Sequence, residues 1–420
     1  MKKVIYIFIA LFLLSCGSNK TASISTETTA EISSPVVTVQ SILSNMENES
    51  YKEGELLVKF KSGVSASVSI MTHQAAGVSV KKTFNLVPNL EHVKLPQNMS
   101  VRDAIVQYMS DPNVEYAEPN YIRHAFSTIP NDTYFDQQWA LNNTGLYANG
   151  TPGADIQASD AWDITRGSGS ITIAVADTGI DYNHPELVGN IWKNTLETSC
   201  TDGIDNDMNG YIDDCIGWDF FNIDNDPIDD HGHGTHVAGT IGAVGNNGEG
   251  VSGVMWNIQL MPLKFLDSDG LGTTADAILA IEYAVANGAR IINASYGGSM
   301  FSQSEYDTIN SANSAGVLLI AAAGNNGANN DLTPAYPASH NLPNIISVTA
   351  TDQNDSRATF SNFGPVSVDV AAPGVYILNT VPPGLTFSLC TGTFSAGYDF
   401  CSGTSMSAPH VSGLAGLLYS

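Results

Sequence analysis

From about residue 130 onward, short apolar segments alternate with segments that have the periodicity of helices. The runs ITIAVAD (171–177), IQLMPLKFL (258–266) and VLLIAAA (317–323) are almost continuously apolar, which is typical of strands buried on both faces. Helical patterns lie at 273–288 and 304–316. Because parallel neighbours need a crossover connection, usually a helix, this alternation predicts an α/β fold: a mostly parallel sheet with helices on both faces.

A smaller domain is predicted ahead of this sheet, over residues 51–124. Its strand patterns are GELLVKF, VSVKKTF, LEHVKL and VEYAEPNYI, and its helical patterns lie at 65–76 and 100–111. The resulting βαββαβ order is that of a ferredoxin-like α+β domain. A free-standing binding domain with the same order is the alternative at this point.

The N-terminus has the features of an export signal. Two lysines precede an apolar stretch from Val4 to Leu14, which is too short for a permanent membrane helix. Residues 1–15 are therefore predicted to be a signal peptide, and LLSC resembles a bacterial lipobox, which would place a lipid on Cys16. A plain signal peptide that contains a cysteine is the alternative. Residues 16–50 are polar, and we expect a flexible tether there.

The segment GTSMSAPH places a serine where a helix begins. Gly403 precedes Ser405, and the apolar run VSGLAGLL follows. We expect Pro409 to lie in the first turn, where its missing N–H would have no partner. The positive end of a helix dipole favours negative charge that develops beside Ser405.

Two further motifs offer the groups that a serine nucleophile needs. The strand at 171–177 ends in Asp177, and His233 lies between glycines in HGHGTHVAG. Asn325 follows the apolar run at 317–323 in a loop rich in small residues. A serine hydroxyl reacts only after a base accepts its proton, so the order Asp177, His233, Ser405 is a candidate catalytic triad.

With these motifs, the chain resembles the subtilisin-like serine proteases over nearly all of residues 130–420. The resemblance implies that His233 is the base, that Asp177 orients it, and that Asn325 and the Ser405 N–H stabilise an oxyanion. It also implies that residues 51–124 are an inhibitory propeptide and 125–420 the catalytic domain. The family continues past the helix that contains Ser405, so a C-terminal truncation at Ser420 is expected.

The same resemblance assigns substrate contacts. Ser295, Tyr296 and Gly297 would line the pocket for the residue before the scissile bond, with Ala335 near its floor. Gly270, Leu271 and Gly272 would hold residues further upstream, because an extended peptide can add to an exposed edge. The small floor predicts apolar side chains there, and ordinary loops are the alternative for both glycine segments.

The remaining cysteines form two pairs that are close in sequence, Cys200 with Cys215 and Cys390 with Cys401. An exported chain reaches a compartment that permits disulfides, so both pairs are expected to be bonded. Free thiols are the alternative.

The charge of the chain argues against nucleic acid as a partner and suggests metal cations. The net charge of −26 would repel nucleic acid. Residues 197–230 contain eleven acids and no Lys or Arg. Within them, the oxygen-bearing residues recur at alternate positions with a glycine at the sixth, as in a Ca²⁺ loop. The candidate ligands are Asp205, Asp207, Asn209, Tyr211, Asp213 and Asp214, and a purely structural turn is the alternative.

A second Ca²⁺ site follows from the family resemblance alone. It would use the side chains of Asp132, Glu186 and Asn247 with the carbonyl groups of Val244, Glu249 and Val251.

These observations together predict an exported, lipid-anchored, calcium-dependent serine endopeptidase made as a proenzyme. Its expected partners are protein or peptide substrates and its own propeptide, with the membrane reached only through the lipid; we expect a monomer. Cleavage after the propeptide would release the mature enzyme. A catalytically silent envelope lipoprotein that uses the fold for binding is the alternative. An esterase is disfavoured, because Gly403–Ser407 lacks the second glycine of a G-x-S-x-G elbow.

Overall fold

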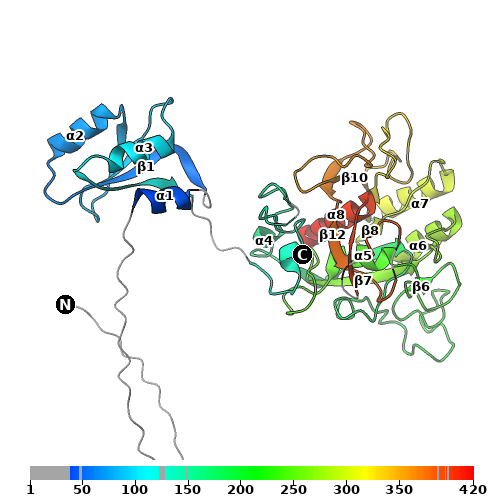
Figure 1. Cartoon of the computed structure of the whole chain (residues 1–420). Coiled ribbons are helices and arrows are strands. Elements are labelled where there is room, and N and C mark those ends of the chain that lie inside the picture. Colours follow the sequence, from blue (N-terminus) through cyan, green and yellow to red (C-terminus); the bar gives the residue numbers. More distant parts are fainter. Residues whose placement is uncertain are drawn as a thin grey trace, which may run out of the picture. The chain divides into compact units, whose positions relative to one another are not determined.

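The computed structural model describes residues 38–46, 50–122, 128–147, 149–385, 387–392, 394 and 397–420. The predicted signal peptide, Cys16, most of the predicted tether and the boundary at 124/125 lie outside these residues. The chain forms two compact units, Met1–Ala125 and Phe126–Ser420, and each is described by itself (Figure 1). No helix in the described part of the chain is long and apolar enough to cross a membrane.

The first unit is built on an antiparallel sheet with the strand order β2-β3-β1-β4. Its helices α2 and α3 follow β1 and β3 in the chain, which is the predicted ferredoxin-like order. Leu56 and Val58 of β1 pack with Ile105 of α3 in its core. The elements are β1 (Tyr51–Phe60), α2 (Ala66–Ala75), β2 (Ser79–Thr83), β3 (Leu90–Lys94), α3 (Val101–Met109) and β4 (Val114–Tyr121).

A short helix, α1 (Val39–Asn45), lies where the sequence predicted flexible tether. Thr38 and Ser41 cap its first turn reciprocally, and Ile42 is only 4% exposed in the core of this unit. Two satisfied backbone donors and one buried isoleucine stabilise this polar segment as a helix. The tether prediction is therefore wrong for these residues, which belong to the folded unit.

The second unit contains a seven-stranded sheet in the order β11-β10-β9-β8-β5-β7-β6, in which every pairing is parallel. This is the α/β architecture that the sequence predicted. The strands are β5 (Gly167–Asp177), β6 (Trp218–Asp219), β7 (Asn257–Lys264), β8 (Ile291–Ala294), β9 (Leu318–Ala322), β10 (Ile345–Thr351) and β11 (Val370–Pro373). The antiparallel pair β12 (Ile377–Thr380) and β13 (Tyr398–Cys401) lies outside the sheet.

Helices cover both faces of this sheet. Successive side chains of a strand point to opposite faces, so Ile173 and Val175 of β5 enter one core and Ala174 and Ala176 enter another. The first core contains α5 (His233–Gly242) and α8 (Thr404–Tyr419); the second contains α6 (Thr274–Ala286) and α7 (Gln303–Ser314). Figure 1 shows α6 and α7 side by side and α8 running through the middle of the unit. Two short helices, η1 (Phe135–Gln137) and α4 (Ala158–Ala161), precede β5.

Candidate active site

The predicted acid and base meet at the carboxyl end of β5, an inner strand of the sheet. Asp177 is the last residue of β5, and His233 is the first residue of α5. His233 Nδ1 lies 2.7 Å from Asp177 Oδ1, with Asp177 0% and His233 8% exposed. Burial lowers the pKa of His233, but the negative charge and hydrogen bond of Asp177 outweigh this effect and raise the pKa above its ordinary value.

Ser405 lies second in α8, where backbone N–H groups have no acceptor within the helix. Its hydroxyl donates to the Ser295 carbonyl over 3.1 Å. No hydrogen bond joins it to His233 in the described residues; catalytic hydrogen bonds are often long in enzymes without substrate. The structure therefore brings Ser405 and the predicted substrate segment into direct contact.

Pro409 differs from the sequence expectation. It is the sixth residue of α8, not part of the first turn, so its missing N–H deprives the Ser405 carbonyl of its helical partner. The Ser295 hydroxyl donates to that carbonyl over 2.9 Å. Each of the two serines thus holds the carbonyl group of the other.

Asn325 is oriented by the residue that precedes the serine. Its Oδ1 accepts hydrogen bonds from the N–H of Thr404, at 2.8 Å, and from the Thr404 hydroxyl, at 3.0 Å. Because the amide oxygen is occupied in this way, the Nδ2 group remains as a hydrogen-bond donor. A residue that stabilises an oxyanion must supply such a donor.

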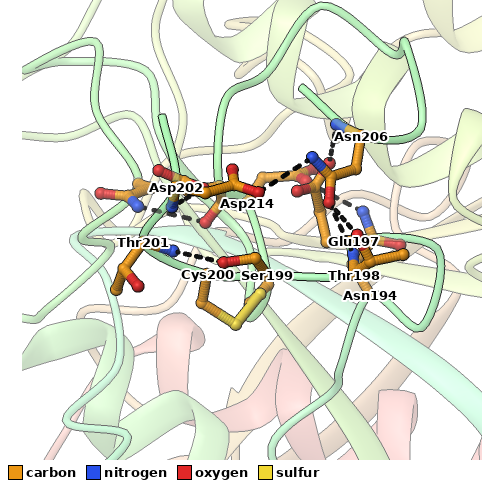
Figure 2. The surroundings of a disulfide bond; sticks show 12 residues. Asn194, Glu197, Thr198, Ser199, Cys200, Thr201, Asp202, Asn206 and Asp214 are labelled. Carbon is orange, nitrogen blue, oxygen red and sulfur yellow. Dashed lines mark hydrogen bonds between the residues drawn. A yellow bond between two sulfur atoms is a disulfide. The ribbon is translucent and has the colours of Figure 1, made fainter. Parts of the chain in front are cut away.

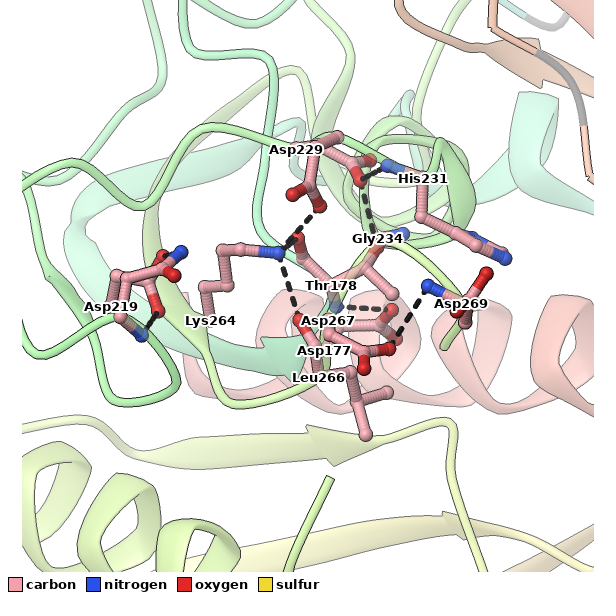
Figure 3. Close-up of polar contacts among 12 residues, drawn as sticks. Asp177, Thr178, Asp219, Asp229, His231, Gly234, Lys264, Leu266, Asp267 and Asp269 are labelled. Atoms are coloured by element: carbon pink, nitrogen blue, oxygen red, sulfur yellow. Dashed lines mark hydrogen bonds and ion pairs between the residues drawn. The ribbon is translucent and has the colours of Figure 1, made fainter. Parts of the chain in front are cut away.

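Two buried charged residues that the sequence analysis missed hold the acid and base segments together. Asp229 accepts the hydroxyl of Thr178, next to Asp177, and the N–H and hydroxyl of Thr235 in α5. Lys264, at the end of β7, donates to Thr178 O, Leu266 O and Asp230 (Figure 3). The only sequence signal for Lys264 is a lysine at the end of an apolar strand.

A cleft of about 400 Å³ runs beside His233. The predicted substrate residues Gly270, Leu271 and Gly272 line it, as do Ser295, Tyr296 and Gly297. Ala335 is not among the lining residues, although its neighbour Tyr336 is. No described residue hydrogen-bonds to the backbone of Gly297, so this edge can receive an extended peptide.

A loop ahead of β13 covers the base. Phe387 lines the cleft, and its ring centroid lies 5.3 Å from that of His233 and 5.1 Å from that of His231. The predicted Cys390–Cys401 disulfide is present and ties this loop to β13. The sequence predicted the disulfide but not the contact between Phe387 and His233. The positions of the two cysteines do not indicate which residue of the loop packs on the histidine ring.

The predicted Cys200–Cys215 disulfide is also present (Figure 2). It lies within the acid-rich segment 197–230, here called the acidic insertion. Inside this insertion, the carboxylates of Glu197, Asp207 and Asp214 lie within 4.8 Å of one another. Glu197 is 7% exposed, and its Oε2 has no hydrogen-bond partner in the described residues. Three converging carboxylates with an unpaired oxygen fit a Ca²⁺ ion, which prefers such ligands.

The other predicted ligands of this loop have different neighbours. Asp205 accepts N–H groups of Asn209 and Gly210, and Asp213 accepts those of Asp202 and Gly203, so both cap turns. The Asn209 amide donates to Asp207 and Asp214, while the ring of Tyr211 packs on Trp218. The sequence analysis missed Glu197, which precedes the recognisable loop pattern.

The second predicted cation site also gathers oxygen atoms. Asp132 and Glu186 are buried, and Asp132 Oδ1 has no partner among the described residues. Glu186 accepts the Asn247 amide at 2.9 Å and the Val251 N–H at 3.1 Å. The N–H of Val244 bonds to the Glu186 carbonyl, and Thr133 bonds to the Glu249 carbonyl. Two buried carboxylates without a basic residue in these contacts fit a cation.

Comparison with known proteins places this geometry in a family. The sequence profile of the subtilase family, peptidase S8, matches residues 168–420, and that of the fervidolysin N-terminal prodomain matches 38–120. The thermophilic serine proteinase of Bacillus sp. (strain AK1) is 37% identical over 91% of this chain and 82% of its own.

Two further proteins are similar over 69% of this chain. Thermitase of Thermoactinomyces vulgaris is 38% identical over 69% of this chain and 85% of its own. The solved structure of a protease from Pseudoalteromonas arctica has a TM-score of 0.55 and 31% identity over 69% of this chain and 87% of that one. The chain therefore belongs to the subtilase family of serine endopeptidases and carries a prodomain of the fervidolysin type.

Proposed function

We propose that this chain hydrolyses peptide bonds by means of Asp177, His233 and Ser405. The observation that carries the proposal is the buried 2.7 Å contact between His233 and Asp177, at the start of a helix, α5, that packs against α8. In this mechanism Ser405 Oγ attacks the scissile carbonyl carbon while His233 accepts its proton. His233 then donates that proton to the leaving amine, and an acyl-enzyme remains.

Water then hydrolyses the acyl-enzyme, and His233 again transfers the proton. His233 accepts a proton from the water that attacks the acyl-enzyme, and returns it to Ser405 as the acid product leaves. Asp177 holds the imidazole in one orientation and stabilises its charged form. The Asn325 amide and the Ser405 N–H donate to the oxyanion in both halves of the reaction.

A fluorophosphonate probe tests the proposal, because it reacts covalently with an activated serine. We expect labelling at Ser405, loss of labelling in Ser405→Ala and His233→Ala, and retained labelling in Ser407→Ala, which removes a neighbouring serine of α8. Peptidase activity should disappear in the same two variants, and Asn325→Ala should lower turnover by about a hundredfold or more. Wild-type protein that neither labels nor cleaves peptides would support the silent scaffold instead.

We further propose that Ca²⁺ stabilises the second unit. Glu197, Asp207 and Asp214 would hold one ion, and Asp132 and Glu186 with the loop at 244–251 would hold another. The ions would neutralise carboxylates that are packed together without a basic residue, and so favour the folded state.

We also propose that the precursor is exported, is anchored through a lipid on Cys16, and is inhibited by its own prodomain. The N-terminal pattern supports export, and the match to a prodomain supports inhibition before maturation. The proposed substrates are proteins or peptides, acted on by a monomer.

A further inference from the structure

The lining of the cleft carries two carboxylates and no lysine or arginine. Asp269 and Glu305 both line the cleft, and the basic residues of the lining are the histidines His231 and His233. The buried amine of Lys264 donates to two carbonyl groups and to Asp230, so its three protons are committed elsewhere.

Glu305 is the buried member of this pair. It lies in the first turn of α7 and is 7% exposed. Its Oε2 contacts His340 Nε2 at 3.1 Å, whereas its Oε1 has no hydrogen bond to any described residue. A carboxylate with one unpaired oxygen at the wall of a cleft needs a donor that the protein itself does not supply.

The contact with His340 engages only one oxygen of Glu305. The His340 ring is buried, and its Nδ1 has no hydrogen-bond partner among the described residues. The second carboxylate oxygen therefore remains available to a ligand in the cleft that Glu305 lines.

A tyrosine lines the same cleft as this carboxylate. The Tyr296 hydroxyl is buried and has no partner in the described part of the chain. Burial raises the pKa of Tyr296, and the negative charge of Glu305 raises it further. Asp269 lies at the exposed rim, where its carboxylate also makes no hydrogen bond to a described residue.

We propose that this end of the cleft is a subsite for a cationic side chain, lysine or arginine, upstream of the scissile bond. This inference rests on the proposed peptidase function. Glu305 would pair with the cation inside the cleft, the Tyr296 hydroxyl would complete the polar wall, and Asp269 would attract the cation at the rim. Arginine suits the site better, because its planar group offers five donors in a fixed geometry.

The test uses active enzyme matured from the full chain and fluorogenic peptides that keep one constant residue before the scissile bond. The second, third and fourth residues upstream are each exchanged in turn for Arg, Lys, Leu or Glu. At one of these positions we expect kcat/KM for Arg to exceed that for Leu by about tenfold or more, because a site built to bind a polar group discriminates strongly against its absence. Equal values for Arg and Leu at all three positions would overturn the inference.

Variants assign the preference to the proposed residues. Glu305→Gln should reduce the ratio of Arg to Leu by about tenfold, and Asp269→Asn should reduce it less, because solvent screens the rim. Asp307→Asn removes the same charge from an exposed position of α7 and should leave the ratio unchanged. Tyr296→Phe, which removes only a hydroxyl, serves if Glu305→Gln does not fold. A ratio that survives the substitution at Glu305, or at Tyr296 in its place, would refute the assignment.

The measurements distinguish failure of the proposed peptidase function from failure of the proposed cationic subsite. Enzyme that cleaves no peptide would refute the proposed function. Enzyme that cleaves leucine peptides well, but without a preference for cations, would refute only the subsite.

Discussion

At the scale of single residues, the reactive groups are held by partners that do no chemistry themselves. Thr404 fixes the Asn325 amide, and Asp229 joins the loop after Asp177 to the start of α5. A catalytic side chain must hold its position within a fraction of an ångström to be effective, so these contacts matter as much as the identity of the triad.

If His233 is the proposed base, its raised pKa sets the acid limb of the activity profile. The base must be neutral, so kcat/KM should rise with pH through a pKa above the ordinary imidazole value of about 6.5. Asp177→Asn removes the charge that raises this pKa, and should move the limb to lower pH while reducing kcat by about 10⁴. A pH profile of both proteins measures the shift. A wild-type limb at or below 6.5 would contradict the assigned role of Asp177.

Replacing Asp229 should loosen this arrangement. Asp229→Asn places an amide donor against the N–H and hydroxyl groups that the carboxylate now accepts, which should cost about 3 kcal/mol of unfolding free energy. We expect kcat to fall together with the melting temperature. Asp226→Asn is the matched control, because Asp226 is exposed and, among the described residues, its carboxylate accepts only the Tyr182 hydroxyl. Equal effects of the two substitutions on kcat would show that Asp229 does not position the triad.

At the scale of elements, the acidic insertion combines a disulfide with a cluster of carboxylates. The Cys200–Cys215 bond closes a loop of 15 residues, worth about 3 kcal/mol in the chain-entropy model. It does nothing to offset repulsion among Glu197, Asp207 and Asp214, which lie within 4.8 Å of one another. The covalent link and a bound cation would therefore stabilise the insertion through separate effects.

Chelation tests the proposed stabilisation by calcium. In the inactive Ser405→Ala protein, which cannot digest itself, the melting temperature should rise with the logarithm of Ca²⁺ concentration. Glu197→Gln should blunt this response, and Asp355→Asn, in the exposed turn at 352–356, should leave it intact. A melting curve that is identical in chelator and in millimolar Ca²⁺ would rule out calcium stabilisation.

Local motifs and distant contacts differed in how well the sequence predicted them. Asp177 ends a recognisable strand and Ser405 opens a recognisable helix, so short stretches of sequence were sufficient for both. Glu197 lies outside the repeating pattern of the loop that it joins, and Lys264 looks like an ordinary residue of an apolar strand. Their roles depend on the packed arrangement, as does helix α1, which relies on burial of Ile42 in a segment of polar composition.

At the scale of the whole molecule, the order of segments has a functional consequence. The proposed lipid lies on Cys16, the prodomain profile covers 38–120, and the subtilase profile begins at 168. A cut between the two folded units would separate the enzyme from its anchor, unless the prodomain stays bound. Maturation would then also release the enzyme, without a separate protease.

Cell fractionation tests this release route. The Ser405→Ala precursor should remain uncut in the membrane fraction, and wild type should appear in the soluble fraction without the residues before about 125. A Cys16→Ala precursor controls for the lipid and should leave the membrane fraction without being cut. Recovery of mature wild type only in the membrane, under conditions that dissociate the prodomain, would exclude the route.

The two hydrogen bonds between Ser295 and Ser405 couple substitutions at positions that are far apart in the sequence. Pro409 leaves the Ser405 carbonyl without a helical donor, and the Ser295 hydroxyl supplies one. Any residue other than proline at position 409 would introduce an N–H group that competes with the Ser295 hydroxyl for the Ser405 carbonyl. Loss of the Ser295 hydroxyl would leave that carbonyl without a hydrogen-bond donor. A substitution at either position therefore requires a compensating change at the other, so the proposed substrate-binding segment and the helix that carries the proposed nucleophile are expected to evolve as one unit.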